Sequence, residues 1–224
     1  MTLITGPSTV GVGEERSGTR QRIVAAAVAL FAEQGFDATS VTEVVARAGV
    51  AKGALYHHFA SKDDLLYEVY RELVDRQLAG LHDILGRGLP PADALRELIA
   101  DLVTTTAARA GEAKVFLRES HRLGDANQAR VRAARRSIHD AVTDLVRAAQ
   151  AAGQFAPVAS PEMVTFTVFG VINELPVWYR ADGPKQPVEI AAELSELILA
   201  ALLPPAAGRV AHRPARGATR KGRT

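Results

Sequence analysis

Residues 40–65 read SVTEVVARAGVAKGALYHHFASKDDL, and this stretch decides the fold of the chain. Ser40 followed by Glu43 matches a capping box, in which each side chain satisfies a backbone N–H of the other residue, so a helix begins there. Gly49 ends that helix, since glycine adopts the left-handed conformation without a steric penalty. A short helix over residues 52–58 follows the turn. The pair is typical of a helix-turn-helix, whose second helix fits the DNA major groove.

Apolar spacing on either side completes a small helical head. Ile23, Ala27, Leu30 and Phe31 recur on one face of a helix that ends at Gly35. Downstream, a serine followed by two acids caps a further helix, which begins near Ser61. We therefore predict a DNA-binding domain over residues 18–66, from which the last helix runs on into the rest of the chain.

The remainder also shows helical spacing, with capping or helix-starting residues at 90–91, 111, 125 and 160–161 and a final helix over 188–203. The prediction is an all-α fold of about nine helices, with the three-helix head joined to a larger ligand-binding and dimerisation body over 67–204. The Gly/Ser/Thr-rich residues 1–17 are predicted to be a flexible arm. Residues 205–224, rich in Pro, Gly, Ala and Arg, are predicted to be a disordered basic tail.

Composition limits the classes of function. Hydrophobic residues make up 47% of the chain and charged residues 23%, as in folded globular proteins. The chain has no cysteine, which excludes disulfides, zinc–thiolate sites and thiol catalysis and suits a cytoplasmic protein. No apolar run reaches the ~18 residues that a membrane span requires, and residues 1–20 lack the pattern of a secretory signal. We expect a cytoplasmic protein without a membrane partner.

The net charge hides an uneven distribution. The chain carries +2, and the tail from residue 205 holds six basic residues and no acid. Removing those six charges leaves the other residues at −4, so DNA binding must rely on a local patch. The tail either solubilises the protein or holds DNA phosphates weakly.

The short helix over 52–58 carries the candidate DNA contacts. Lys52 can reach a guanine edge or a phosphate, and Tyr56 and His57 can donate to phosphates. Gly53 is unusual, since a glycine inside a helix costs roughly 1 kcal/mol relative to alanine, and close approach to DNA explains it. Alternatively, His57 and His58 are surface residues of an ordinary helical hairpin. A metal site is disfavoured, since neighbouring helical side chains point ~100° apart.

These residues carry a family resemblance. The motifs AGV, KGALYHHF and SK followed by DDL, preceded by ALFAEQGFDATS, resemble the head of the TetR family of transcriptional regulators over residues 18–66. The resemblance implies a homodimer on a double-stranded DNA operator with inverted-repeat half-sites. It also implies the DNA-binding residues: Ser40, Thr42, Tyr56, His57 and Lys62 toward the phosphates, and Lys52, Gly53 and Ala54 nearest the bases.

Two positions depart from the family pattern. Valine occupies position 45, where alanine is frequent, and alanine occupies position 51, where serine is frequent. The second departure removes the expected N-cap of the recognition helix, which is worth ~1 kcal/mol.

In the body, the resemblance implies dimerisation through the last two helices. Stripes through Val164, Val168 and Val171, and through Leu194, Leu197, Ile198 and Ala201, either form that interface or face the subunit's own core.

The segment NELPVWYRADGP looks like the WYR-x-x-GP end of family members that respond to acyl-CoA thioesters. A small-molecule effector of this type needs an apolar cavity and nearby cations. The candidate ligand-binding residues are Phe116, Arg118, Arg122, Phe166, Phe169, Asn173, Trp178 and Arg180, with Leu117 as a further apolar candidate; the alternative is that the aromatics are core and the arginines are solvated.

An enzyme is the rival class, and the sequence disfavours it. Glu119, Ser120 and His121 are consecutive and cannot form a relay on one helix, and no phosphate-binding loop, G-x-S-x-G or H-E-x-x-H motif is present. We predict no catalytic residues, no metal and no cofactor. The expected function is a ligand-released homodimeric repressor, with a transcriptional activator or a sequence-indifferent architectural DNA binder as alternatives.

Overall fold

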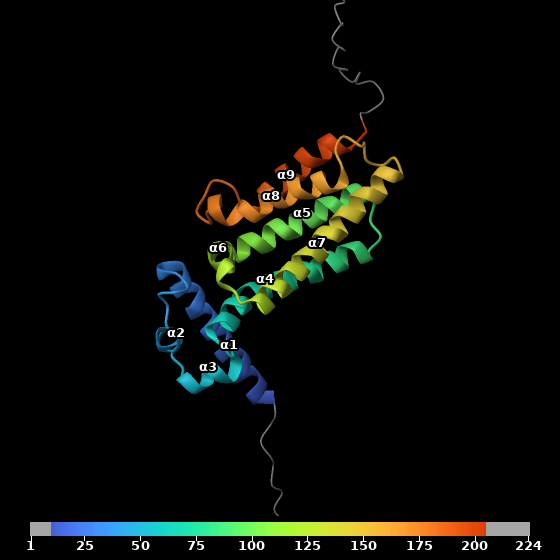
Figure 1. Cartoon of the computed structure of the whole chain (residues 1–224). Helices are drawn as coiled ribbons and strands as arrows, with labels where there is room; N and C mark the ends of the chain where they lie inside the picture. The colour runs from blue at the N-terminus through green and yellow to red at the C-terminus, as the bar shows by residue number, and fades with distance from the viewer. Residues whose placement is uncertain (1–9, 205–224) are drawn as a thin grey trace, which may run out of the picture.

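The computed structural model describes the backbone of residues 10–204 and the side chains from residue 18 onward. Within this range the chain forms nine α-helices, one short 3-10 helix and no strand, which confirms the all-α prediction. Figure 1 shows a small head, formed by the first helices, beside a larger bundle of longer helices. Helix α4 leads from one into the other.

The head contains α1 (Val10–Gln34), α2 (Val41–Ala48), α3 (Lys52–His58) and the first turns of α4 (Lys62–Gly86). Its core is formed by large side chains from all four helices, each nearly or completely buried: Ile23, Phe31, Val44, Leu55, Phe59 and Leu65. Each helix is too short or too polar to be stable alone, so this shared burial holds the helix-turn-helix together.

The predicted capping box of α2 is present. The Glu43 backbone N–H donates to Ser40 Oγ at 3.2 Å, and the Ser40 N–H donates to Glu43 Oε2 at 2.7 Å. The hydrogen bond from the Ser40 backbone N–H has the largest effect on the pKa of Glu43, followed by the one with the Ser40 side chain, and together they hold that pKa below its usual value. At the other end Gly49 has φ 64°, a left-handed conformation that favours glycine. Local chemistry therefore defines both ends of α2.

Helix α3 begins without such a cap. Ala51 holds the extended N-cap conformation, φ −71° and ψ 148°, but has no side chain that accepts a hydrogen bond. The following helix is capped normally, since the Asp64 N–H donates to Ser61 Oγ at 3.0 Å. The missing cap predicted at Ala51 is confirmed.

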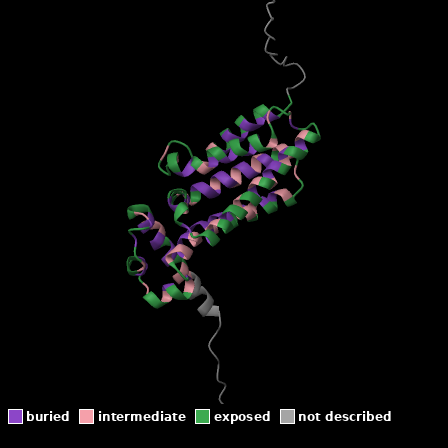
Figure 2. Cartoon of the chain, in the orientation of Figure 1, coloured by how far each residue is buried: buried purple, intermediate pink, exposed green. Residues whose placement is uncertain are grey.

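The body continues from α4 through α5 (Pro91–Ala108), α6 (Ala110–Glu119), the 3-10 helix η1 (Ser120–Arg122), α7 (Asp125–Ala151), α8 (Pro161–Trp178) and α9 (Pro187–Leu202). Helix α5 lies in the middle of the bundle and packs against α4, α8 and α9 (Figure 1). Figure 2 shows the buried residues concentrated on the inward faces of these helices and the exposed ones on the outside.

The predicted arm and tail fare differently against the structure. The flexible arm was predicted over residues 1–17, but α1 begins at Val10, so residues 10–17 are helical. The absence of apolar periodicity over residues 10–17 did not exclude a helix, because an existing helix can be extended by residues that have no apolar face. The predicted tail over 205–224 lies outside the described residues.

The expected dimer stripes divide between two environments. Val164, Val168, Leu194 and Ile198 are buried within the subunit, which contradicts their assignment to an interface. Leu197 is 70% exposed and Val171 is 36% exposed, so these two remain available to a second subunit. The helical periods of α8 and α9 could not distinguish the two sides, because both faces carry apolar residues.

The missing cap gives a first prediction. Ala51→Ser should raise the free energy of unfolding by about 1 kcal/mol, because the serine hydroxyl can accept a backbone N–H in the first turn of α3. Chemical denaturation of the purified variant measures the change. Ala46→Ser, on the exposed side of the last turn of α2 where a hydroxyl cannot act as an N-cap, is the control and should not stabilise the protein. Equal stability of wild type and Ala51→Ser would place the start of α3 elsewhere.

Candidate nucleic-acid interface and effector pocket

The outward face of α3 carries the side chains predicted to contact DNA. Lys52, Gly53, Tyr56 and His57 are all exposed, and their spacing places them on one side of the helix. Tyr56 is 52% exposed, which is unusual for an aromatic residue without a partner surface. Ala54 is half-buried at the edge of this face. The face is therefore short, polar and mildly basic.

Residues at the start of α2 complete the surface. Ser40 and Thr42 are both exposed. Ser40 Oγ is already engaged as the N-cap of α2, but its hydroxyl proton remains able to donate. The first turn of α2 therefore places two hydroxyl groups at the surface of the head.

Gly53 has no packing role within the subunit. A Cβ added at this position would meet no atom within 4 Å, and the residue does not adopt a positive φ. Neither a steric contact nor the backbone conformation therefore requires glycine here. The remaining physical reason for a small residue on an exposed helix face is the close approach of another molecule.

Lys62 has internal partners that sequence reasoning missed. Its Nζ donates to the carbonyl oxygens of Phe36 at 2.8 Å and Thr39 at 2.9 Å, and it lies 4.3 Å from the centre of the Phe36 ring. These contacts fix the connection between α1 and α2 to the start of α4. Lys62 therefore stabilises the head, and its phosphate contact stays a prediction.

In the body, two of the predicted ligand-binding residues meet. Phe116 and Asn173 line a small inner cavity of about 50 Å³ between α4, α6, α7 and α8, together with Leu117. The Phe116 ring stacks on Tyr70, with ring centres 3.4 Å apart, and burial raises the pKa of the Tyr70 hydroxyl. Apolar walls with a few polar groups are typical of small-molecule sites.

The inner cavity also contains a polar pair that the sequence did not reveal. Gln77 and Thr106 are buried and joined by a hydrogen bond of 3.1 Å from Gln77 Nε2 to Thr106 Oγ1. Both line the cavity. With Asn173 and Arg135 they provide the hydrogen-bonding groups of a cavity whose other walls are apolar, and a carbonyl of a bound molecule can use such groups.

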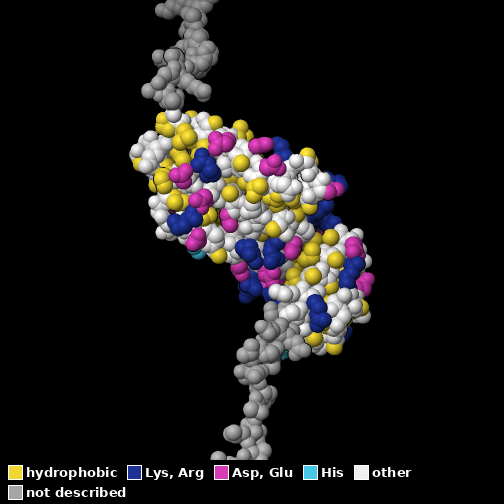
Figure 3. Space-filling view, turned by 180° about the vertical axis from the view of Figure 1, so that it is seen from behind, with side chains coloured by type: hydrophobic (Ala, Val, Ile, Leu, Met, Phe, Trp, Pro, Cys, Tyr) yellow, Lys and Arg dark blue, Asp and Glu magenta, His cyan; other side chains and the backbone are white. Residues whose placement is uncertain are grey.

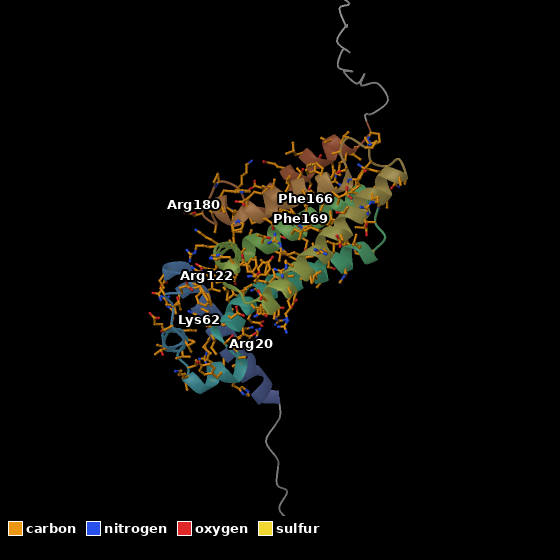
Figure 4. The ribbon with its side chains drawn as sticks, in the orientation of Figure 1. Arg20, Lys62, Arg122, Phe166, Phe169 and Arg180 are labelled. Atoms are coloured by element: carbon orange, nitrogen blue, oxygen red, sulfur yellow. The ribbon has the colours of Figure 1, made fainter. Side chains whose placement is uncertain are left out.

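The other predicted aromatics lie elsewhere. Phe169 is buried and stacks on His139 at 4.0 Å, whereas Phe166 is 62% exposed on the outer side of α8. Burial, followed by the charge of Arg135, lowers the pKa of His139 and favours its neutral form. Phe169 is therefore a core residue between α7 and α8. Figure 4 shows both phenylalanines on α8, away from the head.

The four remaining candidates are not brought together. Trp178 is 48% exposed at the end of α8, and Arg180 follows it in a loop where it pairs with Asp182 at 3.2 Å. Arg122 pairs with Asp37 of the head at 2.8 Å. Figure 4 shows Arg122 beside the head and Arg180 in the loop after α8, at the end of the body that faces the head.

Arg118 belongs to the contact between head and body. Its guanidinium donates to the carbonyl oxygens of Phe31 and Ala32 at the end of α1, and its Nε donates to Glu119 Oε1 at 2.7 Å. These carbonyls lie in the last turn of α1, where the negative end of the helix dipole favours a cation, although Phe31 O also accepts the Gly35 N–H at 3.1 Å. Arg118 and Arg122 therefore join α6 and η1 to the head.

Asp63 provides a second connection between the head and the body. Its carboxylate accepts the Gly124 N–H and the Asn127 side-chain amide, both at 2.6 Å, at the start of α7. Nearby, Glu72 accepts from Arg20 at 2.7 Å and Arg109 at 3.2 Å. Burial alone would raise the pKa of Glu72, and the two arginines lower it below its usual value. Figure 3 shows basic and acidic side chains side by side at this narrowing of the molecule.

A larger pocket of about 460 Å³ opens between α6, η1 and α7. We call it the arginine pocket, and its lining residues are Phe116, Ser120, His121, Leu123, Gln128, Val131, Arg132, Arg135 and Arg136. The sequence signal was the run VRAARR on α7, whose first and last two arginines share one helix face. No group of three or more acidic or histidine side chains in the described residues is arranged to hold a metal ion.

No described helix is long and apolar enough to cross a membrane.

Comparisons with known families cover both parts of the chain. Residues 23–69 match the family described as bacterial regulatory proteins, tetR family, and residues 88–202 match the tetracyclin repressor-like C-terminal domain. The second match alone spans about half of the chain.

Individual relatives and solved structures are also similar to this chain over most of its length. The transcriptional repressor KstR2 of Mycolicibacterium smegmatis is 25% identical over 181 residues, which cover 80% of this chain and 88% of KstR2. A crystal structure of a tetR-family regulatory protein from Rhodococcus RHA1 has a TM-score of 0.75 and 28% identity, covering 82% of this chain and 96% of that one. The crystal structure of AibR with isovaleryl coenzyme A and operator DNA has a TM-score of 0.68 at 23% identity, covering 80% of this chain and 97% of that one, and shows likeness of fold.

Gly53 gives a prediction in which stability and DNA binding change in opposite directions. Gly53→Ala should raise the free energy of unfolding by about 0.5–1 kcal/mol, since alanine is the better helix former and meets no neighbour. The same methyl group should weaken binding to DNA. Thermal unfolding and a fluorescence-anisotropy titration with duplex DNA measure the two effects.

Gly86→Ala is the control, because Gly86 ends α4 far from α3 and a Cβ there also meets nothing. It should leave DNA affinity unchanged. If Gly53→Ala binds DNA as tightly as Gly86→Ala, close approach at Gly53 is wrong.

Proposed function

This chain belongs to the TetR family of bacterial regulatory proteins, and we propose that it is a homodimeric repressor released from an inverted-repeat operator by an acyl-thioester effector. The family is one of transcriptional regulators, with a helix-turn-helix head and a helical body. The observation that carries the proposal for DNA is the exposed face of α3, where Lys52, Gly53 and Tyr56 project from a well-packed head. A helix whose outer side is short and polar can enter the major groove.

A single head of this kind discriminates bases poorly, since Lys52 is its one long base-reaching side chain on α3. Two heads held at the spacing of successive major grooves, ~34 Å on B-DNA, read two half-sites together. Sequence specificity therefore depends on a dimer that fixes this spacing.

The outer sides of α8 and α9 support the dimer. Large apolar side chains are exposed on both helices: Met163, Phe166, Val171, Val177 and Trp178 on α8, and Val188 and Leu197 on α9. Soluble monomers rarely expose a contiguous apolar surface of this kind. Two such helices from each subunit form a four-helix interface with two-fold symmetry.

The inner cavity supports an effector with an apolar group. It is lined by Tyr70, Phe116 and Ile172, with Gln77, Thr106 and Asn173 as its hydrogen-bonding groups. Its volume of about 50 Å³ holds only a few heavy atoms, so a ligand must displace side chains as it enters. AibR, which has a similar fold, has been solved with isovaleryl coenzyme A and operator DNA, and a small branched acyl group is a ligand of suitable chemistry here.

The proposed mechanism is a population shift. The ligand stabilises a body conformation in which the two α3 helices no longer match successive major grooves, so affinity for the operator falls. Helix α4 transmits the change, since it lines the inner cavity through Tyr70, Leu73 and Gln77 and also forms part of the head core.

Operator selection tests this function. Purified full-length protein is used to enrich genomic DNA fragments, and the resulting complex is then challenged with a series of acyl-CoAs. We expect enrichment of an inverted repeat and its release by one acyl class at micromolar concentration. Failure to enrich any sequence would contradict the operator, and a complex indifferent to every acyl-CoA would contradict the effector alone.

The dimer interface has its own prediction. Leu197→Arg should shift the protein toward monomer and lower operator affinity at least about tenfold, because a charge would be buried at the interface. Sedimentation velocity measures the oligomeric state. The control is Val158→Arg, at a similarly exposed apolar residue in the connection before α8. A Leu197→Arg protein that sediments like Val158→Arg would place the interface elsewhere.

A further inference from the structure

Three arginines face the arginine pocket without a charged partner. Arg132, Arg135 and Arg136 take part in none of the ion pairs of the described residues, although Arg87, Arg96 and eight other arginines do. The one hydrogen bond in the group runs from Arg132 to Gln128 Oε1 at 3.1 Å. The pocket lining contains no carboxylate.

The three arginines lie close enough to repel one another. Arg132 precedes the other two by three and four positions, so all three guanidinium groups extend from one side of α7. Like charges at this spacing repel each other on a helix. The nearest acid on α7, Asp140, lies one turn beyond Arg136 along a neighbouring surface hollow that Arg132 and Arg136 also line. A bound polyanion would remove the repulsion and use the unpaired donors.

The arginine pocket adjoins the inner cavity. Phe116 and Arg135 line both spaces, with Arg135 half-buried between them. The inner side offers apolar walls, whereas the outer side offers three guanidinium groups and the polar groups of Ser120, His121 and Gln128. A ligand that spans both must have an apolar end and an anionic end.

We propose that the arginine pocket binds the phosphorylated end of the effector through Arg132, Arg135 and Arg136, while its apolar group occupies the inner cavity. This assignment rests on the proposed function and names the chemical class of its ligand, an apolar acyl group on a phosphorylated carrier. Several guanidinium groups suit a polyphosphate, because each presents planar, paired donors to phosphate oxygens. A free carboxylate needs only one of the three. The cations predicted from the sequence, Arg118 and Arg122, instead hold the head.

The position of the pocket connects its occupant to the head. Ser120 and His121 of η1 line the pocket, and the residues flanking them, Arg118 and Arg122, contact the end of α1 and Asp37. A phosphate that draws η1 toward α7 therefore acts on the same short segment that holds the head. The site thus places the charged end of the ligand where it can alter the orientation of the head.

Direct binding to the full-length protein in the absence of DNA tests the site. The probes are coenzyme A without an acyl group and pantetheine, which is the same carrier without its nucleotide and phosphates. Isothermal titration should show coenzyme A binding at least about tenfold more tightly than pantetheine. Arg132→Ala and Arg136→Ala should each weaken coenzyme A binding about tenfold and leave pantetheine unaffected.

Arg130→Ala is the matched control. Arg130 is an exposed arginine on the same helix, but it lies over the Tyr67 ring on another side of α7. It should bind coenzyme A like the wild type. Arg132→Gln and Arg136→Gln repeat the test with an uncharged side chain that is longer than alanine. Unfolding curves establish that each variant is folded.

Two outcomes would overturn the proposal: equal affinity of the wild type for coenzyme A and pantetheine, or arginine-pocket variants that bind coenzyme A as tightly as Arg130→Ala. Neither depends on DNA. Failure to enrich an operator would contradict the proposed function and leave this titration interpretable, whereas loss of the phosphate site would leave a repressor with a different effector.

Discussion

Helix α4 is the constraint on which the rest of the structure depends, because a single continuous helix contributes to two cores. Leu65 and Leu66 are fully buried near the head, whereas Leu73 and Leu81 are buried in the body. The helix cannot bend easily at Val69 or Tyr70, since no proline or glycine interrupts these turns. A change in the position of α4 within the body must therefore also move the first turns of α4, which pack in the head.

Besides α4 and the packing of α1 on α6, the head and the body are joined by polar, partly exposed contacts. Asp63 holds the start of α7, Arg118 holds the end of α1, and Arg122 pairs with Asp37. Exposed ion pairs typically contribute ~0–1 kcal/mol, far less than a buried apolar core. The head is thus well packed internally and held to the body by weaker contacts, as a regulator with two head orientations of similar free energy requires.

The sequence predicted the helix-turn-helix well because short-range chemistry determines it. Ser40 with Glu43, Gly49 and Ser61 each act within four residues of their own position, so the ends of α2 and the start of α4 follow from local hydrogen bonds and backbone conformation. The side chains of α3 were also predictable, since a seven-residue helix with one buried leucine must expose the remaining ones. The hydrogen-bond partners of long cationic side chains were not predictable. Lys62 and Arg118 reach backbone carbonyls of α1 and its connection, from segments 23 to 87 positions away in the chain.

From local patterns alone, the helices, most of their ends, the family and the surface of α3 could be predicted, whereas the start of α1 could not. The tertiary structure alone decided which arginines are free to meet a ligand, which faces of α8 and α9 are buried, and that Phe116 lies beside Arg135. The difference arises from the distance along the chain over which each interaction acts. Caps and turns are set by neighbours along the chain, whereas burial and charge pairing depend on which helices pack together, and an arginine of several rotatable bonds has the same local signature in either environment.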